Sequence, residues 1–291
     1  MTWGACARET LRPVRRGTRG DMSDVRECRG IALVSGASSG FGARIAQVLS
    51  AGGFDVIALA RRAELLEVLA EEDPYRAILP VVADVRDRNA VGRAVSELPD
   101  EYRDISVLVN NAGLSRGFGP VQQGAAAHWR EMIDTNITGV LNLTEAVLPR
   151  LVARGSGHVV NVGSIAAEYP YMGGNVYAAT KAFVHQLSLN MRVDLQGTGV
   201  RVSCVAPGMA KTEFARVRYE GDLQRAEALY DGLTPLSADD VAQSVAWCLD
   251  QPPHVNINMI ELMPAEQPFG LGFAGSRSGD PGGASGGADA S

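Results

Sequence analysis

The amino-acid sequence predicts a single α/β domain built on one doubly wound parallel sheet with helices on both faces. Short, continuous apolar segments recur along the chain, as in strands that are buried on both faces. Segments whose apolar residues have helical spacing separate these strands, which is typical of parallel sheets. The first apolar segment, Ile31–Ser35, also ends in a glycine-rich turn before a helix. In such a fold, ligands bind at the carboxyl ends of the strands.

Strands and helices are expected to alternate through residues 30–265, with no internal repeat or interior linker. The predicted strands are Ile31–Ser35, Asp55–Ala60, Ile78–Ala83, Ile105–Val109, His158–Val162, Val200–Val205 and Asn256–Glu261. The predicted helices are Gly42–Ala51, Glu64–Glu72, Asn89–Leu98, Trp129–Arg154 with an interruption near Gly139, Val176–Gln196 and Asp239–Leu249.

Composition is that of an ordinary globular protein, since 46% of the 291 residues are apolar and 21% are charged. The net charge of −6 argues against a nucleic-acid surface, which would carry a basic stripe. No apolar run approaches the ~20 residues of a membrane span. The four cysteines and four histidines lack metal-ligand spacing, so no metal site is expected. The cysteines are expected to be free thiols in a reducing cytoplasm.

The two ends of the chain differ from the segment between them. Residues 1–29 are rich in arginine but also contain acidic residues, so no transit peptide is expected. No signal peptide is expected either, because no apolar segment follows. They are predicted to form a disordered arm, or to precede the true start at Met22. Residues 266–291 form a tail rich in glycine, serine and alanine. The tail is predicted to be disordered from about residue 276, because it cannot bury enough apolar surface.

The turn after the first strand has the glycine spacing of a dinucleotide-binding loop. Gly36 lets the chain turn off the strand, Gly40 lets the backbone approach a diphosphate, and Gly42 lets the next helix pack on the sheet. The N-terminus of that helix offers free N–H groups to the phosphates. A glycine cluster alone is weak evidence, but its place between a first strand and a helix predicts a cofactor site. The candidate contacts are Gly36, Ser38, Ser39, Gly40, Phe41 and Gly42.

The end of the second strand indicates NADP rather than NAD. An NAD enzyme places a carboxylate there for the ribose 2′-hydroxyl. This chain instead has Arg61 and Arg62, whose guanidinium groups match a 2′-phosphate, and Ser38 is a further candidate donor. The alternative is that both arginines face solvent at the start of a helix.

The ends of the third and fourth strands supply further candidate contacts with the cofactor. Asp84 and Val85 follow the third strand, where they would meet an adenine. At the end of the fourth strand, small residues would let the backbone pass close to the cofactor. These residues are Asn111, Ala112 and Gly113.

A phenol and an ammonium group define the candidate catalytic centre. Tyr177 and Lys181 are spaced to lie on one face of a helix, one turn apart. A positive charge near a phenol lowers its pKa, and bringing the phenol from ~10 toward neutrality needs about 4 kcal/mol, which the lysine and an oxidised nicotinamide together could supply. Ser164, at the end of the fifth strand, would hold the substrate oxygen against Tyr177. The tyrosine and lysine alone also fit a surface pair, but a serine and a glycine turn in addition favour a catalytic site.

With these motifs, residues 30–265 resemble the short-chain dehydrogenase/reductase family. The resemblance rests on the glycine turn, on Asn110–Gly113, on Ser164, Tyr177 and Lys181, and on Pro207-Gly208. It implies that Tyr177 is the acid/base, that Lys181 binds the nicotinamide ribose and that Ser164 orients the substrate. It further implies that Asn136 holds a water linked to Lys181, and that Pro207, Gly208 and Thr212 contact the cofactor. Ser35 replaces the family's usual threonine but keeps its hydroxyl.

Within that family, the chain is similar to the bacterial NADP-dependent serine and 3-hydroxy acid dehydrogenases. The segments Tyr169–Tyr177, Thr212–Phe214 and His254–Asn258 carry this similarity. It implies a small 3-hydroxy acid as substrate (serine, allo-threonine, 3-hydroxyisobutyrate or 3-hydroxypropionate, with malonic semialdehyde as its oxidised partner), and a homotetramer.

A buried carboxylate requires a cation, and the candidates are Lys211, Arg216 and, preferred here, Arg218. Tyr169, Met172 and Gly173 are candidates for the opposite wall of the pocket. The long helical segments also carry more apolar residues than one buried stripe requires, which is consistent with an oligomer.

Two other interpretations of the same sequence stay open. One is a reductase of the same fold that acts on another ketone, such as a 3-oxoacyl thioester. The other is a non-catalytic dinucleotide-binding regulator, since fold alone does not fix function. The regulator is disfavoured because such proteins usually lose the tyrosine or the lysine, and both are present here.

Overall fold

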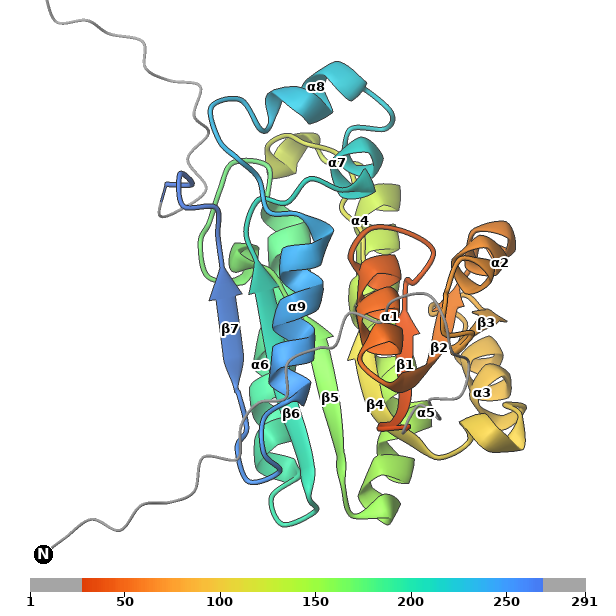
Figure 1. Ribbon diagram of the computed structural model, residues 1–291. Helices are drawn as coiled ribbons and strands as arrows, with labels where there is room; N and C mark the ends of the chain where they lie inside the picture. The colour runs from red at the N-terminus through yellow and green to blue at the C-terminus, as the bar shows by residue number, and fades with distance from the viewer. Residues whose placement is uncertain (1–27, 269–291) are drawn as a thin grey trace, which may run out of the picture.

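The computed structural model describes residues 28–268, and within them the predicted fold class is confirmed. Seven parallel strands form one sheet in the order β3-β2-β1-β4-β5-β6-β7 (Figure 1). The strand order reverses between β1 and β4, so the connections on either side of this point leave in opposite directions. A crevice therefore opens at the carboxyl ends of these two strands.

All seven strands fall where the sequence predicts them. Only β7 begins clearly later than predicted. There Asn256 pairs with the backbone of Val202 through its side-chain amide, with both hydrogen bonds at 2.9 Å. The strands are β1 Gly30–Ser35, β2 Phe54–Ala60, β3 Ile78–Val82, β4 Ile105–Asn110, β5 Gly157–Val162, β6 Val200–Pro207 and β7 Met259–Leu262.

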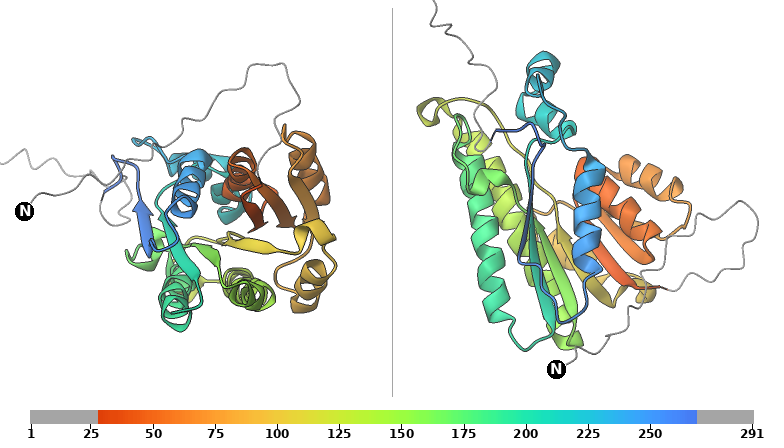
Figure 2. Two further views of the ribbon diagram at one scale, coloured as in Figure 1. Left: turned by 60° about the horizontal axis from the view of Figure 1, so that its bottom comes forward. Right: turned by 60° about the vertical axis from the view of Figure 1, so that its left-hand side comes forward.

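Helices cover both faces of the sheet, so that the domain has three layers (Figure 2). Each helix presents its apolar stripe to one of two separate clusters of buried residues. On one face lie α1 Gly40–Ala51, α2 Ala63–Glu71 and α9 Ala238–Leu249, and on the other lie α3 Arg88–Ser96, α5 Gly139–Arg154 and α6 Asn175–Asp194.

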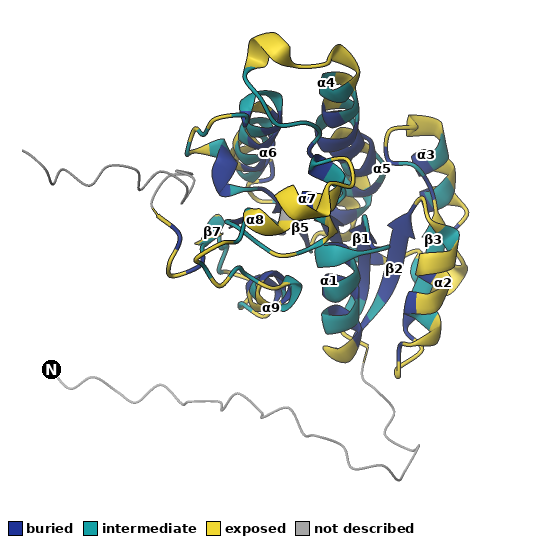
Figure 3. Cartoon of the chain, turned by 90° about the horizontal axis from the view of Figure 1, so that it is seen from above, coloured by how far each residue is buried: buried dark blue, intermediate teal, exposed yellow. Residues whose placement is uncertain are grey.

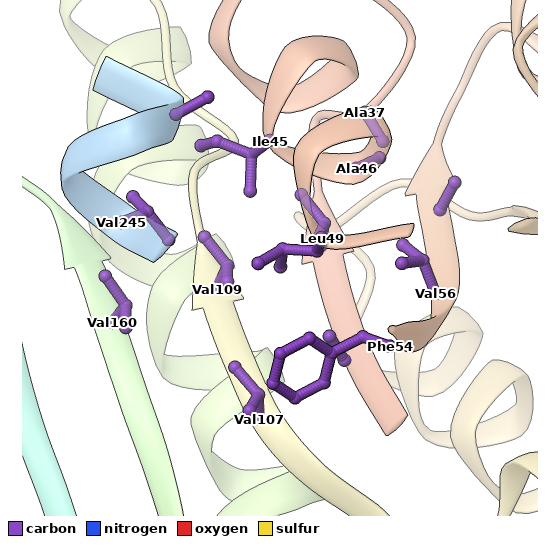
Figure 4. Packing of buried hydrophobic residues seen from close by; sticks show 14 of the residues in the cluster. Ala37, Ile45, Ala46, Leu49, Phe54, Val56, Val107, Val109, Val160 and Val245 are labelled. Atoms are coloured by element: carbon purple, nitrogen blue, oxygen red, sulfur yellow. The ribbon is translucent and has the colours of Figure 1, made fainter. Parts of the chain in front are cut away.

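The core under α1 fixes the place where the glycine turn begins its helix. Ile45 and Leu49 of α1 pack against Val109 of β4 and Val245 of α9 (Figure 4). Each fully buried side chain of this kind contributes about 1.5–3 kcal/mol to stability. The N-terminus of α1 is thereby held at the carboxyl end of β1.

The interruption predicted near Gly139 is a π-helical turn over Asp134–Thr138, between α4 (Ala126–Ile133) and α5. A Cβ at Gly139 would lie 2.6 Å from Cγ2 of Val85, so only glycine lets α5 approach the end of β3 this closely. Such turns are frequent at functional sites. This one carries the buried Asn136.

Two short helices were not predicted, α7 (Glu213–Arg218) and α8 (Leu223–Ala228). Each has only six residues, too few to show an amphipathic period. Both lie above the carboxyl ends of the strands (Figures 1 and 3). Three 3-10 turns complete the described secondary structure, at Asp100–Tyr102, Val121–Gln123 and Ile165–Ala167.

The predicted disordered arm and tail lie largely outside the described residues. Arg29, which is described, pairs with Asp250 at 2.6 Å, and Gln267 is buried against Gly208 and Met209. No helix between residues 28 and 268 combines the length and apolar character needed to cross a bilayer.

Candidate active site

A cavity of about 590 Å³ lies at the carboxyl ends of the strands, under α7 and α8. It brings together residues from the turn after β1, the ends of β2, β3 and β4, the start of α6, and the segment after β6. The predicted cofactor contacts that line it are Gly36, Ser38, Ser39, Gly40, Phe41, Arg61, Arg62, Asp84, Val85, Asn111, Ala112, Gly113, Tyr177, Lys181, Pro207, Gly208 and Thr212.

Gly42 lies behind the cavity wall rather than in it. A Cβ there would lie 2.3 Å from the carbonyl oxygen of Gly36 and 2.5 Å from Nδ2 of Asn111, so no larger residue fits. Gly36 and Gly40 adopt φ angles of 67° and 56°, a region that favours glycine. These contacts press the first turn of α1 against the ends of β1 and β4, as the spacing predicts.

Ser35 ties the same two strand ends together. Its Oγ accepts hydrogen bonds from the backbone N–H groups of Asn111 and Ala112, both at 3.0 Å, and donates to the carbonyl of Val109 at 3.2 Å. The hydroxyl is therefore fully used, which explains why serine can replace the threonine expected at this position.

Arg62 reaches the glycine turn, although its side chain stays 45% exposed. Its guanidinium donates to Ser38 Oγ at 3.0 and 3.1 Å and to Ser39 Oγ at 2.6 Å, and it pairs with Glu213 at 3.3 Å. Arg61 lies 4.0 Å from the carboxylate of Asp84. Two cations thus flank the cavity where the second strand ends.

The carboxylate of Asp84 is held ionised at this end. Burial disfavours its charge, but hydrogen bonds from Arg86 and the charges of Arg86 and Arg61 outweigh burial and lower the pKa of Asp84. A fixed carboxylate here can accept hydrogen bonds from a ligand.

The predicted catalytic side chains meet at the other end of the cavity. Tyr177 and Lys181 project from α6 and are 8% and 6% exposed. Ser164, at the end of β5, hydrogen-bonds to the Tyr177 phenol, and its Oγ accepts the N–H of Ala166 at 3.1 Å. The three lie on one wall, next to the cofactor-binding turn.

The expected lowering of the Tyr177 pKa by Lys181 is not produced by the protein's own groups. Burial raises the pKa of Tyr177 above its ordinary value, and the nearby Tyr171 phenol raises it further. The hydrogen bond with Ser164 and the charge of Arg218 act in the opposite direction but are weaker. Nζ of Lys181 lies 6.0 Å from the ring centroid, and its charge is not among the groups that lower the pKa of Tyr177.

Lys181 is itself strongly affected by burial. Desolvation lowers the pKa of Lys181 to about 8, and Nζ donates to the carbonyl of Val162 at 2.8 Å. Asn136 lies behind the cavity and does not line it. Its amide donates to the Leu114 carbonyl at 2.9 Å and to Thr180 at 3.0 Å, and Oδ1 accepts the Leu114 N–H. This side chain therefore fixes α6 to the end of β4.

Arg218, the preferred anion-binding candidate, is 7% exposed and lines the cavity. Its guanidinium carbon lies 5.2 Å from the ring centroids of both Phe118 and Tyr171. Nη2 donates to the carbonyl of Gly173 at 3.2 Å, whereas Nε is buried and has no partner among the described residues. A buried donor without a partner indicates a site for an acceptor. Lys211 and Arg216 are exposed and are not among the lining residues.

The structure does not bring Tyr169 and Met172, the predicted pocket residues, to the cavity wall. The hydroxyl of Tyr169 donates to Glu261 of β7 at 3.1 Å, and Met172 is 74% exposed. Tyr171, between them, faces the cavity instead. The local sequence does not reveal which side of this loop faces inward, because a contact with a distant strand decides it.

Sequence reasoning also missed several lining residues. Arg116 donates to Glu131 at 2.9 Å and to the Val217 carbonyl at 3.2 Å, and so joins the end of β4 to α7. Phe214 packs on Tyr177 with ring centroids 5.4 Å apart. No motif marks these positions. Among residues 28–268, no group of three or more His, Cys, Asp or Glu side chains is arranged to hold a metal ion.

The fold, the glycine turn and the Ser164–Tyr177–Lys181 wall define a dinucleotide-dependent dehydrogenase. The model of the short chain dehydrogenase family matches residues 30–222, and the chain belongs to that family.

Several relatives and one solved structure show which members of the family the chain is similar to. The chain is 49% identical to serine 3-dehydrogenase of Agrobacterium fabrum over 82% of this chain and 96% of the relative. It is 49% identical to sulfoacetaldehyde reductase 2 of Chromohalobacter salexigens (81% and 95%) and 47% identical to the NADP-dependent 3-hydroxy acid dehydrogenase of Salmonella typhi (82% and 96%). A solved structure of the closed form of serine dehydrogenase complexed with NADP+ superimposes with a TM-score of 0.80 at 45% identity, covering 82% of this chain and 96% of that one.

Proposed function

We propose that this enzyme is an NADP-dependent oxidoreductase that interconverts small 3-hydroxy acids and the corresponding 3-oxo acids. The observation that carries the proposal is a buried cation facing the acid/base. Arg218 lines the same cavity as Ser164 and Tyr177, and its charge acts on the Tyr177 phenol. A hydroxy acid presents an anion and a carbinol a short distance apart, which matches this arrangement.

The residues at the other end fit NADP. A Cβ at Gly36 would lie 2.9 Å from the Ala112 Cα, and one at Gly42 would lie 2.3 Å from the Gly36 carbonyl oxygen. The two glycines therefore hold the N-terminus of α1, with its free N–H groups, at the end of β1, where a diphosphate would bind. Arg61, Arg62 and Ser38 supply donors for a 2′-phosphate, and Asp84 would accept from the adenine. The NADP dependence printed for the relative from Salmonella typhi supports this assignment.

The protein's own groups handle the proton. When bound, the nicotinamide accepts or supplies the hydride at its C4. In the oxidative direction, Tyr177 first releases its own proton to solvent, which the positive charge of an oxidised nicotinamide would favour. The phenolate Oη then takes the proton of the substrate hydroxyl, while Ser164 Oγ holds that oxygen in place. Because burial raises the pKa of Tyr177, the neutral phenol is favoured and is ready to donate in the reductive direction.

Lys181 and Asn136 support this step. With a pKa lowered to about 8, Lys181 exchanges protons near neutral pH, and we assign its Nζ to the nicotinamide ribose because Lys181 lines the cavity. The side chain of Asn136 hydrogen-bonds to Leu114 and Thr180, so we propose that it positions α6. The water linked to Lys181 would then be held by other atoms of the π-helical turn.

Serine, allo-threonine, 3-hydroxyisobutyrate and 3-hydroxypropionate are the proposed substrates, with malonic semialdehyde as the oxidised partner of the last. A guanidinium group can also donate hydrogen bonds to a sulfonate, and one relative is a sulfoacetaldehyde reductase. The test is therefore a panel of alcohols with NADP+ and NAD+, containing these acids, 2-hydroxyethanesulfonate, a neutral alcohol and a 3-hydroxyacyl thioester. We expect turnover of the 3-hydroxy acids with NADP+. Turnover of the thioester or neutral alcohol alone would overturn the proposal.

Cofactor choice is tested by replacing both Arg61 and Arg62 with alanine. Each guanidinium–phosphate hydrogen bond contributes about 1.5–3 kcal/mol, so the affinity for NADP+ should fall at least tenfold while that for NAD+ changes little. Equal changes for both cofactors would remove the 2′-phosphate assignment.

We further propose a homotetramer in the cytoplasm. Apolar side chains stand exposed on α5 and α6, among them Leu141, Val152, Leu189 and Val193, and such helices can pair between subunits. The cysteines of the described chain, Cys28, Cys204 and Cys248, are free thiols, as suits a reducing compartment. Light scattering of the purified enzyme tests the assembly.

A further inference from the structure

Glu213 lies among the groups assigned to the 2′-phosphate, although its charge has the wrong sign for that ligand. It is the first residue of α7 and lines the cavity. Its Oε2 lies 3.3 Å from Nη1 of Arg62, and its carboxylate is also hydrogen-bonded to Ser39. Neither the glycine turn nor the chemistry at Tyr177 requires a carboxylate here.

Arg62 has all three of its nitrogens engaged in this arrangement. Nε donates to Ser38 Oγ, Nη2 donates to Ser38 Oγ and Ser39 Oγ, and Nη1 faces Glu213. The two serines belong to the cofactor-binding turn, whereas Glu213 belongs to the helix above it. A phosphate that binds this guanidinium bidentately needs donors that Glu213 now holds.

We propose that Glu213 competes with the 2′-phosphate of NADP(H) for Arg62 and thereby sets how strongly the enzyme prefers NADP(H) over NAD(H). The inference rests on the proposed use of Arg61 and Arg62 for the phosphate. Two anions on one guanidinium repel each other, so the phosphate must displace the carboxylate or bind beside it at a cost. NAD(H) brings no phosphate and leaves the pair of Arg62 and Glu213 intact. Glu213 therefore lowers the affinity of the phosphorylated cofactor alone.

The size of the effect follows from the exposure of the pair. The side chains of Arg62 and Glu213 are 45% and 44% exposed, so solvent and salt screen the repulsion. At this exposure we expect a three- to tenfold effect, roughly, on affinity, larger at low ionic strength.

The experiment compares the binding of 2′,5′-ADP and 5′-AMP, which differ only in the 2′-phosphate, by calorimetry on the full chain. Glu213→Gln keeps the size of the side chain and one acceptor oxygen but removes the charge. It should tighten 2′,5′-ADP three- to tenfold, roughly, and leave 5′-AMP within twofold. Glu227→Gln is the matched control, because it makes the same change in net charge on the neighbouring α8. Glu227 pairs with Lys211 at 2.6 Å and is not among the lining residues.

A second background separates competition from a merely structural role. In an Arg62→Ala variant, Glu213→Gln should no longer tighten 2′,5′-ADP. The inference is overturned if Glu213→Gln weakens 2′,5′-ADP, shifts both ligands equally, or acts no differently from Glu227→Gln. If the wild-type chain binds 5′-AMP and 2′,5′-ADP equally, the cofactor assignment itself fails and this inference fails with it.

Discussion

At the cofactor end of the cavity the walls are mainly backbone from adjacent strand ends, whereas at the substrate end they are side chains from segments far apart in the chain. The turn after β1 is fixed by the close approach of Gly42 to Gly36 and by the hydrogen bonds of Ser35. Arg218, by contrast, is held between Phe118 and Tyr171, which come from two different loops.

This difference predicts how each end responds to change. A Cβ added at Gly42 would lie within 3 Å of the Gly36 backbone, so a substitution in the glycine turn is a steric event. Side chains on loops can move, so substitutions at the substrate end should change affinity in a graded way. Tyr177 lies where the two ends meet, and it is the position at which chemistry can be removed without disturbing either.

The largest expected effect is that of Tyr177→Phe. General acid–base catalysis contributes about 10²–10⁴-fold, so kcat should fall by at least about 10²-fold while NADP+ affinity stays within a few-fold. Steady-state kinetics with cofactor titration measures both. Tyr169→Phe is the matched control, since Tyr169 contacts Glu261 and not the cavity, and it should keep full activity. Unchanged turnover in the Tyr177 variant would refute the mechanism.

Arg218→Met tests the substrate end. The side chain keeps its length between the two rings but loses the charge. Loss of a charged hydrogen bond costs about 1.5–3 kcal/mol, so KM for the hydroxy acid should rise about 10- to 150-fold with little change in kcat. Arg216→Met, on the exposed side of the same helix, is the control. A similar rise in both variants would mean that the anion is bound by general electrostatics.

The difference between the cofactor end and the substrate end also explains which parts of the site the sequence predicts. The glycine turn, the two arginines and the tyrosine–lysine pair are short strings whose partners lie within the same or the neighbouring βα unit. All seven strands and the helices between them, except α7 and α8, also follow from local periodicity.

The substrate end is less accessible to sequence reasoning. The sequence predicts that Tyr169 lines the pocket, but in the structure its hydroxyl donates to Glu261 of β7, and Tyr171 lines the cavity instead. The helix α7 is too short to show a helical period of apolar residues, so the sequence does not reveal the contact between its Glu213 and Arg62. The direction of the Tyr177 pKa depends on burial, which the spacing to Lys181 does not reveal.

Gly42→Ala tests the steric character of the cofactor end. The added methyl group would meet the Gly36 carbonyl at 2.3 Å, so we expect a loss of up to about 3 kcal/mol in the free energy of unfolding, together with weaker NADP+ binding. Gly92→Ala is the matched control, because Gly92 lies in helix α3 with nothing within 4 Å of its added Cβ. That variant should gain up to about 1 kcal/mol, as alanine is the better helix former. Equal stability changes in the two variants would contradict the steric interpretation.

The smallest expected effect is a pH dependence of stability that arises at the junction of the two ends. Burial lowers the pKa of Lys181 from 10.5 to about 8, so between these pH values the unfolded chain binds more protons than the folded one. Stability from this group therefore rises with pH through that window, and the cost of burying the ammonium is fully present below pH 8.

Lys181→Met should be more stable than the wild type at pH 7.5, by about 2–3 kcal/mol, and the gap should narrow toward pH 9.5. Urea titrations at several pH values measure it, and they stop below pH 10 because the raised pKa of Tyr177 acts in the opposite direction above that value. Parallel stability curves for the two proteins would show that Lys181 is solvated, and the cofactor end would then be less tightly closed than its backbone contacts indicate.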